Sequence, residues 1–294
     1  MNILILGCNG YIGFEICRLY QGSKHKVVGV DSNFNFERVS ELVRYGIEFY
    51  HRDIFNCSDL VKKSDICINC ISITDVPQLK NQETKEKSDL IFKVGTEGNR
   101  VIMQDAKRLV FISTHVVFEG INEDIFNINE VREPKPLLSY GLSKYQSELD
   151  LKKYHDDYLI LRLGSVYGEP ASRWKILPNL FSKFAAIDGK IKVFGGNCLK
   201  PLIGVQDVAL AAKFLGESEY SKEIFHIVNE NLTVNQVAQI CKNHKPSVQI
   251  EETLNKSASE GYSLSNSKLL KTGFQFKTNL VGEIGKMIKH LSII

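Results

Sequence analysis

The chain has 294 residues, of which 43% are hydrophobic and 24% charged, an ordinary composition for a globular protein with one large core or two smaller ones. Its net charge of +3 comes without dense runs of lysine and arginine, which argues against a nucleic-acid-binding stripe. No apolar run reaches the roughly 18 residues that a membrane span needs, and the start lacks the features of a signal peptide, so we expect a cytoplasmic protein that binds neither nucleic acid nor membrane.

The first half of the chain alternates short apolar runs with patterns of helical period. Near-continuous runs of branched apolar residues, separated by helices, indicate a parallel sheet that is covered on both faces. The sequence therefore predicts a doubly wound α/β domain over residues 1–163. Its expected strands are 2–7, 26–31, 48–53, 65–70, 108–113 and 158–163, and its expected helices are 11–20, 88–107 and a segment that begins at Tyr140.

From about residue 164 the pattern becomes less regular. We expect residues 164–294 to form a smaller, mixed α/β lobe, in which residues 202–230 pack back on the first domain. The local signals here are a helix followed by a short strand at 173–196, Asp207 as the cap of a helix through Leu215, a strand at 223–229 and a capping box made by Thr233 and Gln236.

The cysteines and histidines give no sign of a metal or disulfide site. Seven cysteines is an odd number, which argues against a full disulfide framework. Cys67 and Cys70 form a C-x-x-C pair, but they lie in an expected strand, where residues three apart point to opposite faces. The histidines are scattered without ligand spacing. We therefore predict no metal site.

A glycine-rich turn follows the first expected strand and opens the first helix. Gly7, Gly10 and Gly13 have the spacing G-x-x-G-x-x-G. Glycines allow a tight turn and a close approach of the backbone to a pyrophosphate, where the free N–H groups of the helix favour negative charge. This arrangement predicts a dinucleotide site of the Rossmann type. The other loop residues assigned to it are Asn9, Tyr11 and Ile12.

Two carboxylates at strand ends bear on the choice of dinucleotide. Asp31 ends the second strand, 18 residues after Gly13, close to the spacing expected of a carboxylate on the adenosine ribose. No basic residue comes before Arg38, so NAD is favoured over NADP. Asp53, followed by Ile54, could face the adenine, and a cap at the strand end is the alternative interpretation.

Three further residues predict the chemistry. Tyr140 and Lys144 are four apart on an expected helix and so share a face. A lysine cation one turn away favours the phenolate and lowers the pKa of the tyrosine, which could then exchange a proton with a substrate hydroxyl as hydride moves at the same carbon. Thr114, beside Ser113 at the end of the fifth strand, is placed to donate a hydrogen bond to the developing oxyanion.

With these residues the sequence resembles the extended short-chain dehydrogenase/reductase family, in its nucleotide-sugar-modifying branch. The stretches that carry the resemblance include GCNGYIG, VVGVDSN, FISTHVVFEG, SYGLSK, LRLGSVYG and VFGGNCLKPLIGVQDVA. The resemblance implies an enzyme, commonly a homodimer, whose second lobe binds a nucleotide-diphosphate sugar. It implies that Thr114, Tyr140 and Lys144 are catalytic, that Ile71 and Ser72 line the cofactor, that Gly164 and Ser165 contact nicotinamide and sugar, and that Lys200 grips the pyrophosphate of the substrate.

The departures from the family pattern narrow the expected reaction. His115 and Val116 stand where 4,6-dehydratases carry Asp-Glu, which argues against dehydration, and Gly95 is the nearest match to a helix asparagine of the family. The second lobe and Asp31 favour an NAD-dependent nucleotide-sugar epimerase that oxidises a sugar carbon transiently, C4 in our expectation. STHVVFEG is similar to a stretch of dTDP-4-dehydrorhamnose reductases, so a nucleotide-4-keto-sugar reductase is the alternative. A second and less favoured alternative is a non-catalytic dinucleotide-binding protein.

Overall fold

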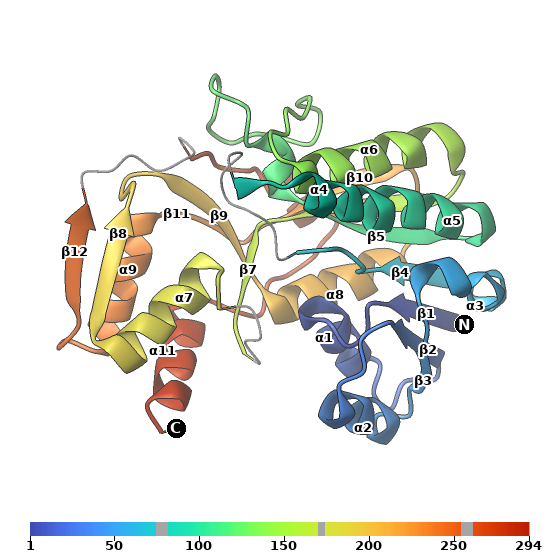
Figure 1. Cartoon of the computed structure of the whole chain (residues 1–294), viewed down its shortest axis with the longest axis horizontal. Coiled ribbons are helices and arrows are strands. Elements are labelled where there is room, and N and C mark those ends of the chain that lie inside the picture. The colour runs from blue at the N-terminus through green and yellow to red at the C-terminus, as the bar shows by residue number, and fades with distance from the viewer. Residues whose placement is uncertain (75–81, 170–173, 254–260, 294) are drawn as a thin grey trace. The chain divides into compact units, whose positions relative to one another are not determined.

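Figure 1 shows the computed structural model of the chain, in which the structure describes residues 1–74, 82–169, 174–253 and 261–293. Two compact units divide the chain, and each is built from separate stretches of sequence. The first unit comprises residues 1–120, 133–162 and 209–225, and the second comprises residues 121–132, 163–208 and 226–294.

The first unit is built on a parallel sheet. Within the described residues this sheet has seven strands in the order β10-β6-β5-β4-β1-β2-β3. The central pairs β1–β2, β1–β4, β2–β3 and β4–β5 are all parallel. The expected strands are confirmed, with the bounds β1 Asn2–Leu6, β2 Lys26–Asp31, β3 Glu48–His51, β4 Ile66–Asn69, β5 Leu109–Thr114, β6 Tyr158–Leu163 and β10 Glu223–Ile227.

The order of the strands fixes where a ligand can bind. From β1 the chain moves outward to β2 and β3, and it then returns to place β4 on the other side of β1. This reversal is the topological switch point of a doubly wound sheet, and in such sheets ligands bind outside the carboxyl ends of the strands at this point. The predicted Rossmann-type fold is confirmed.

Helices cover both faces of this sheet. Alternate strand residues point to opposite faces, so Leu109 and Phe111 pack with Ile102 and Leu151, from α5 and α6, in one core cluster. Val110, which lies between them, faces Gly216 at the end of α8. Figure 1 shows α5 and α6 side by side over one face. The helices are α1 Tyr11–Leu19, α2 Phe36–Arg44, α3 Ser58–Lys63, α4 Lys85–Phe92, α5 Gly98–Asp105, α6 Ser139–Tyr154 and α8 Val205–Gly216.

Short helical turns complete the first unit. The long helical pattern predicted at 88–107 is divided by a π-helical turn, η3 (Lys93–Glu97), between α4 and α5. A 3₁₀ turn, η1 (Ile54–Asn56), follows β3, and another, η4 (His115–Phe118), follows β5. These two turns begin directly after strand-end residues that the sequence assigns to the site, Asp53 and Thr114.

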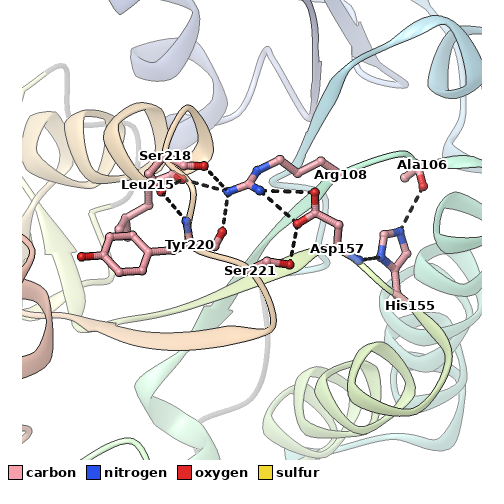
Figure 2. Close-up of polar contacts among 8 residues, drawn as sticks. All are labelled: Ala106, Arg108, His155, Asp157, Leu215, Ser218, Tyr220 and Ser221. Carbon is pink, nitrogen blue, oxygen red and sulfur yellow. Dashed lines mark hydrogen bonds and ion pairs between the residues drawn. The ribbon is translucent and has the colours of Figure 1, made fainter.

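A polar network closes the amino ends of β5 and β6 (Figure 2). The two Nη groups of Arg108 donate to both carboxylate oxygens of Asp157, at 3.0 and 3.3 Å, and to the main-chain oxygens of Leu215, Ser218 and Tyr220. Leu215 lies at the end of α8, and Tyr220 lies before β10. The arginine therefore ties the end of this helix and the approach to the outermost strand to the amino edge of the sheet.

The second unit has its own sheets and core. β9 (Leu199–Gly204) pairs with β7 (Ser165–Tyr167) and β11 (Glu230–Thr233), while β8 (Lys190–Phe194) pairs in parallel with β12 (Gln249–Thr253). A π-helical turn, η5 (Phe184–Asp188), joins α7 to β8. The helices are α7 Leu177–Lys183, α9 Val234–His244, α10 Ser267–Lys271 and α11 Leu280–Leu291. The core includes Tyr167, Phe181, Ile191, Leu202, Val237, Ile284 and Met287.

One local prediction for this region is confirmed and one is wrong. Thr233 and Gln236 make the capping box at the start of α9, with both reciprocal hydrogen bonds present. Asp207 does not cap α8, because the helix begins two residues earlier, at Val205. Its carboxylate instead accepts hydrogen bonds from the main-chain N–H groups of Lys277 and Thr278. Of the helices described, none is long and apolar enough to cross a membrane.

Candidate active site

The glycine loop lies against the end of β4, at the switch point. Gly7 has φ +80°, and a Cβ at this position would lie 3.2 Å from the main chain of Cys70 and Ile71. A Cβ at Gly13 would lie 2.1 Å from the carbonyl oxygen of Gly7. Only glycine fits either position, the first for its conformation and the second for the close packing of helix on loop. The structure thus brings Gly7 together with Ile71, as the sequence-based site requires.

The end of β2 is joined to the loop by hydrogen bonds. One carboxylate oxygen of Asp31 accepts from the N–H of Asn9 at 2.9 Å, and the other accepts from the N–H of Asn33 at 2.9 Å. The side-chain amide of Asn9 donates to the carbonyl oxygen of Asn33. Desolvation outweighs these bonds and raises the pKa of Asp31. The carboxylate is therefore held in place, and each oxygen keeps a lone pair.

These residues fit a dinucleotide. The glycines form a cradle that any Cβ would fill, and Gly10 at the N-terminus of α1 has no side chain that could cap the helix there. The Oδ1 atom of Asn9 is buried without a hydrogen-bond partner in the described structure. A buried acceptor of this kind would be satisfied by a hydroxyl group, such as that of a ribose.

The remaining residues assigned to the cofactor have more local roles. Asp53 is exposed and caps η1 by accepting from the N–H of Phe55 at 3.0 Å, in line with the alternative interpretation of this residue. Ile54 is buried and would contact any Cβ at Gly98. The N–H of Ile71 donates to the side chain of Asn69 at 3.0 Å. Tyr11 is buried, whereas Ile12 and Ser72 are half-buried.

Asn69 is a positioning residue that sequence reasoning missed. It is buried at the end of β4, where its amide donates to Asn99 and its oxygen holds the turn at Ile71. A polar residue at the end of an otherwise apolar strand was the available signal.

Tyr140 and Lys144 both lie in the first two turns of α6. Tyr140 is half-buried, whereas the Lys144 side chain is almost fully buried. Its ammonium group donates to the carbonyl oxygen of Ile112 at 2.8 Å and lies 4.5 Å from the ring centre of Phe111. Desolvation lowers the pKa of Lys144 to about 8. A cation held in apolar surroundings acts strongly on neighbouring groups, because little solvent screens it.

Thr114 and Ser113 have different environments at the end of β5. The Oγ atom of Ser113 donates to Glu148 at 2.6 Å, in the interior of the unit. The Oγ1 atom of Thr114 accepts from the N–H of Val116 at 3.3 Å, at the start of η4. This bond uses an acceptor site and leaves the hydroxyl proton of Thr114 to be donated. Thr114 is therefore the better oxyanion donor of the two.

Glu148 connects these elements beneath the site. It lies one turn beyond Lys144 on α6 and forms a fully buried ion pair with Arg162 of β6, at 2.7 Å. It also accepts the hydroxyl of Ser113. A buried pair with extra hydrogen bonds is sensitive to the loss of either partner. The pair therefore fixes α6, with Tyr140 and Lys144, relative to the ends of β5 and β6.

The second unit contains the other predicted site residues. Ser165, at the start of β7, pairs in register with Leu202 of β9, and a Cβ at Gly164 would lie 2.9 Å from the oxygen of Pro201. Lys200 lies on β9 and lines a pocket of about 650 Å³. Three lysines and an apolar wall surround this pocket: Lys190, Lys192, Lys200, Leu177, Leu180, Phe181, Phe184, Phe194 and Val234, with Asp188 as the one carboxylate among its described lining residues.

Two curated proteins to which the chain is similar are named for glycan or polysaccharide biosynthesis. It is 29% identical over 175 residues to the "probable low-salt glycan biosynthesis reductase Agl14" of Haloferax volcanii, and the match covers 57% of this chain and 54% of that protein. It is 25% identical over 178 residues to the spore coat polysaccharide biosynthesis protein SpsK of Bacillus subtilis, covering 59% and 56%. The match thus spans about half the length of each relative.

Solved structures share the whole fold. UDP-glucuronic acid 4-epimerase of Bacillus cereus, solved with UDP-glucuronic acid and NAD, superposes with a TM-score of 0.84 at 19% identity, covering 100% of this chain and 99% of that one. The family is identified by sequence, because the model described as "RmlD substrate binding domain" matches residues 1–273. The chain therefore belongs to the RmlD substrate binding domain family, within the extended short-chain dehydrogenases/reductases.

Proposed function

We propose that the chain is an enzyme that modifies the sugar of a nucleotide-diphosphate sugar, with Tyr140 as its proton donor and acceptor. The observation that carries this proposal is the combination, within one unit, of a glycine cradle at the switch point and a buried lysine one turn from Tyr140. Burying the charged group of a lysine in an apolar interior costs free energy of folding. A non-catalytic dinucleotide-binding protein would gain nothing that offsets this cost.

The chemistry follows from the charges of these residues. A bound nicotinamide dinucleotide, held by the glycine loop and Asp31, would donate or accept the hydride. In the direction of reduction, Tyr140 donates its phenolic proton to the carbonyl oxygen of the sugar, and the phenolate is stabilised by the Lys144 ammonium. Thr114 donates a hydrogen bond to the same oxygen while negative charge develops on it. In the direction of oxidation the same groups work in reverse.

The pocket of the second unit has groups that suit a nucleoside diphosphate. A diphosphate carries two negative charges. Lys192 and Lys200 give the pocket positive charge in excess of Asp188, whereas Lys190 is paired with Glu251. The aromatic and aliphatic wall suits the flat face of a base. We propose that this pocket holds the nucleoside diphosphate and that Lys200 contacts its phosphates.

For the net reaction we propose reduction of a keto group on the nucleotide sugar. The sequence-based expectation of an epimerase stays a second candidate, favoured by the Asp31 carboxylate, which is poised to accept from a ribose hydroxyl of NAD. Two observations favour the reductase: the relative that is 29% identical over about half of each chain is named a probable reductase, and STHVVFEG is similar to the corresponding stretch of keto-sugar reductases. An NAD(H) or NADP(H) pool would supply the hydride.

The test is a panel of UDP- and dTDP-sugars and their 4-keto derivatives, incubated with the purified chain with and without reduced dinucleotide. We expect a keto sugar to be reduced with stoichiometric loss of nicotinamide absorbance, and NMR to identify the new hydroxyl. Interconversion of two sugars without added dinucleotide would show that the chain is an epimerase and not a reductase. Failure to convert any sugar under both conditions would contradict the proposed function.

A further inference from the structure

Three charged side chains are buried together in the first unit, behind the candidate active site. Lys144 and Glu148 are four residues apart on α6, and Arg162 lies on β6. Each of the three is at most 2% exposed. Two are cations and one is a carboxylate, so the group carries one net positive charge when Lys144 is protonated. Such charges act strongly on one another, because little water screens them in a buried site.

Glu148 is hydrogen-bonded to Arg162, whereas Lys144 has a different partner. Oε1 of Glu148 accepts from the hydroxyl of Ser113 at 2.6 Å and from Nε of Arg162 at 3.1 Å. Oε2 accepts from the same Nε at 3.2 Å and from Nη2 at 2.7 Å. A carboxylate has about four lone-pair sites, which these contacts occupy. Lys144 donates instead to the main-chain oxygen of Ile112 at 2.8 Å. The carboxylate therefore neutralises Arg162 and leaves the charge of Lys144 to act on the site.

The same contacts fix the position of Lys144 along β5. Lys144 and Glu148 bond to consecutive residues of this strand, Ile112 and Ser113, and the next residue is Thr114, the proposed oxyanion donor. Residues four apart on a helix share a face, so both side chains of α6 reach the strand together. Loss of Glu148 would therefore free the helix on one side of Lys144.

The charge of Glu148 also bears on the protonation of Lys144. Burial lowers the pKa of Lys144 to about 8, and the negative charges of Cys70 and Glu148 oppose this effect. Burial raises the pKa of the Cys70 thiol to about 12, so the thiol is neutral near pH 7. Tyr145 and Lys152, on the same helix, also interact with Glu148. Near neutral pH, Glu148 is therefore the anion that favours the charged form of Lys144.

We propose that Glu148 is a positioning residue that, by neutralising Arg162, keeps the ammonium group of Lys144 charged and in place one turn from Tyr140. The proposal rests on the proposed function, in which Lys144 acts on Tyr140. Without the carboxylate, two buried cations would repel each other, and Lys144 would release its proton at a lower pH. Without the guanidinium, the carboxylate would be unbalanced, and Lys144 would keep its proton to a higher pH. The two losses thus predict shifts of opposite sign.

The experiment measures the pH profile of kcat for keto-sugar reduction in the full chain, in Glu148→Gln, in Arg162→Met and in the double variant. Asp150→Asn is the control, because Asp150 is a carboxylate of the same helix whose partner, Arg100, is exposed. A second measurement needs no substrate. The free energy of unfolding against pH, with and without Lys144→Met, follows the titration of Lys144 in each background.

We expect the rate of reduction to fall as the pH rises, because the reaction uses the protonated Tyr140 and Lys144. Glu148→Gln should move this fall about one pH unit lower and Arg162→Met about one pH unit higher, and the double variant should restore the profile. Asp150→Asn should leave the profile in place. A lower rate without a shift in the profile would show that Glu148 only supports the fold, and would overturn the proposal.

The measurement without substrate separates this proposal from the proposed function. If the unchanged chain reduces no keto sugar, but Lys144 titrates at a lower pH in Glu148→Gln, only the proposed function is overturned. An unshifted titration would overturn the positioning role. Should Glu148→Gln fail to fold, Glu148→Gln/Lys144→Met is the deciding variant. Removal of the second cation should restore folding, and a chain that stays unfolded would overturn the proposal.

Discussion

The polar residues at the two edges of the main sheet differ in how fully their hydrogen-bonding groups are satisfied. At the amino edge, the Arg108 network is closed: its Nη donors are used by one carboxylate and three main-chain oxygens, and Asp157 accepts from Ser221 as well (Figure 2). His155 donates through Nε2 to the oxygen of Ala106 and accepts from the N–H of Asp157. Among the buried side-chain atoms of this network in the described residues, the Nε atom of Arg108 lacks a hydrogen-bond partner.

At the carboxyl edge of the sheet, several polar groups have hydrogen-bonding capacity that the described structure does not use. The start of α1 at the glycine loop has no side-chain cap, and the side-chain oxygen of Asn9 is buried without a partner in the described structure. The guanidinium of Arg38 donates from Nη1 to the main-chain oxygen of Asn9 and has further N–H donors in reserve. Lys144 is a cation in apolar surroundings, whose pKa is lowered to about 8 by burial. Each of these features costs stability in the isolated chain.

The comparison distinguishes residues that stabilise the sheet from residues that are available to bind a ligand. Networks whose donors and acceptors satisfy one another stabilise the fold, and their loss should change unfolding rather than binding. Groups that are held in place but incompletely satisfied are those that a ligand can complete. Variants at the two edges should therefore differ in which measurement they change.

The largest effect is expected at the glycine loop. In Gly13→Ala the new Cβ would lie 2.1 Å from the oxygen of Gly7, so helix and loop must separate. We expect dinucleotide affinity, measured by fluorescence titration, to fall at least about 100-fold, with a loss of about 1–3 kcal/mol in unfolding free energy from overpacking. Gly216→Ala is the control, because its Cβ would meet Val110 at an ordinary 3.4 Å. Unchanged affinity in Gly13→Ala would argue against the site.

The buried ammonium group of Lys144 should make the free energy of unfolding depend on pH. The pKa of this lysine is about 8 in the folded chain against 10.5 for an unperturbed lysine, so between these values the unfolded chain binds more protons and stability rises with pH. Relative to Lys144→Met, the unchanged chain should gain on the order of 1–3 kcal/mol between pH 8 and pH 10.5 in denaturant unfolding. Lys63→Met, an exposed lysine, serves as control. A difference that is independent of pH would contradict the burial of the cation.

At the amino edge we expect a smaller effect, and one on stability alone. Arg108→Met removes the donors to Asp157 and to the end of α8, and should lower the unfolding free energy by about 1–2 kcal/mol. Arg52→Met breaks a more exposed pair with Asp59 and should cost under about 1 kcal/mol. Michaelis constants of Arg108→Met should stay unchanged below its melting temperature. A selective loss of turnover would show that the two edges are coupled.

Much of this fold could be predicted from sequence, because its signals are local. Buried parallel strands are near-continuous apolar runs, and the glycine spacing directly follows one of them. The capping box at Thr233 was predictable for the same reason, since its two partners are three residues apart.

What could not be predicted depends on contacts between distant residues. Asp207 has the sequence of a helix cap, but its partners lie seventy residues later, at Lys277 and Thr278. Arg38 is too far along the chain to suggest a contact with the glycine loop, and the turn at Asn35 brings it back. Gly95, the nearest match to an asparagine of the family pattern, lies where a Cβ would be 2.4 Å from the Ser143 hydroxyl, a constraint that only the packing of α6 reveals.

Tyr140→Phe tests the central claim most directly, because it removes one oxygen from the site and leaves the ring. The two quantities to measure are the rate of keto-sugar reduction in a single turnover and the dissociation constant for the dinucleotide. We predict a rate lower by on the order of 10²–10⁴-fold and a dissociation constant within about 2-fold of the unchanged chain. A rate equal to that of the unchanged chain would remove Tyr140 from the chemistry and contradict the account.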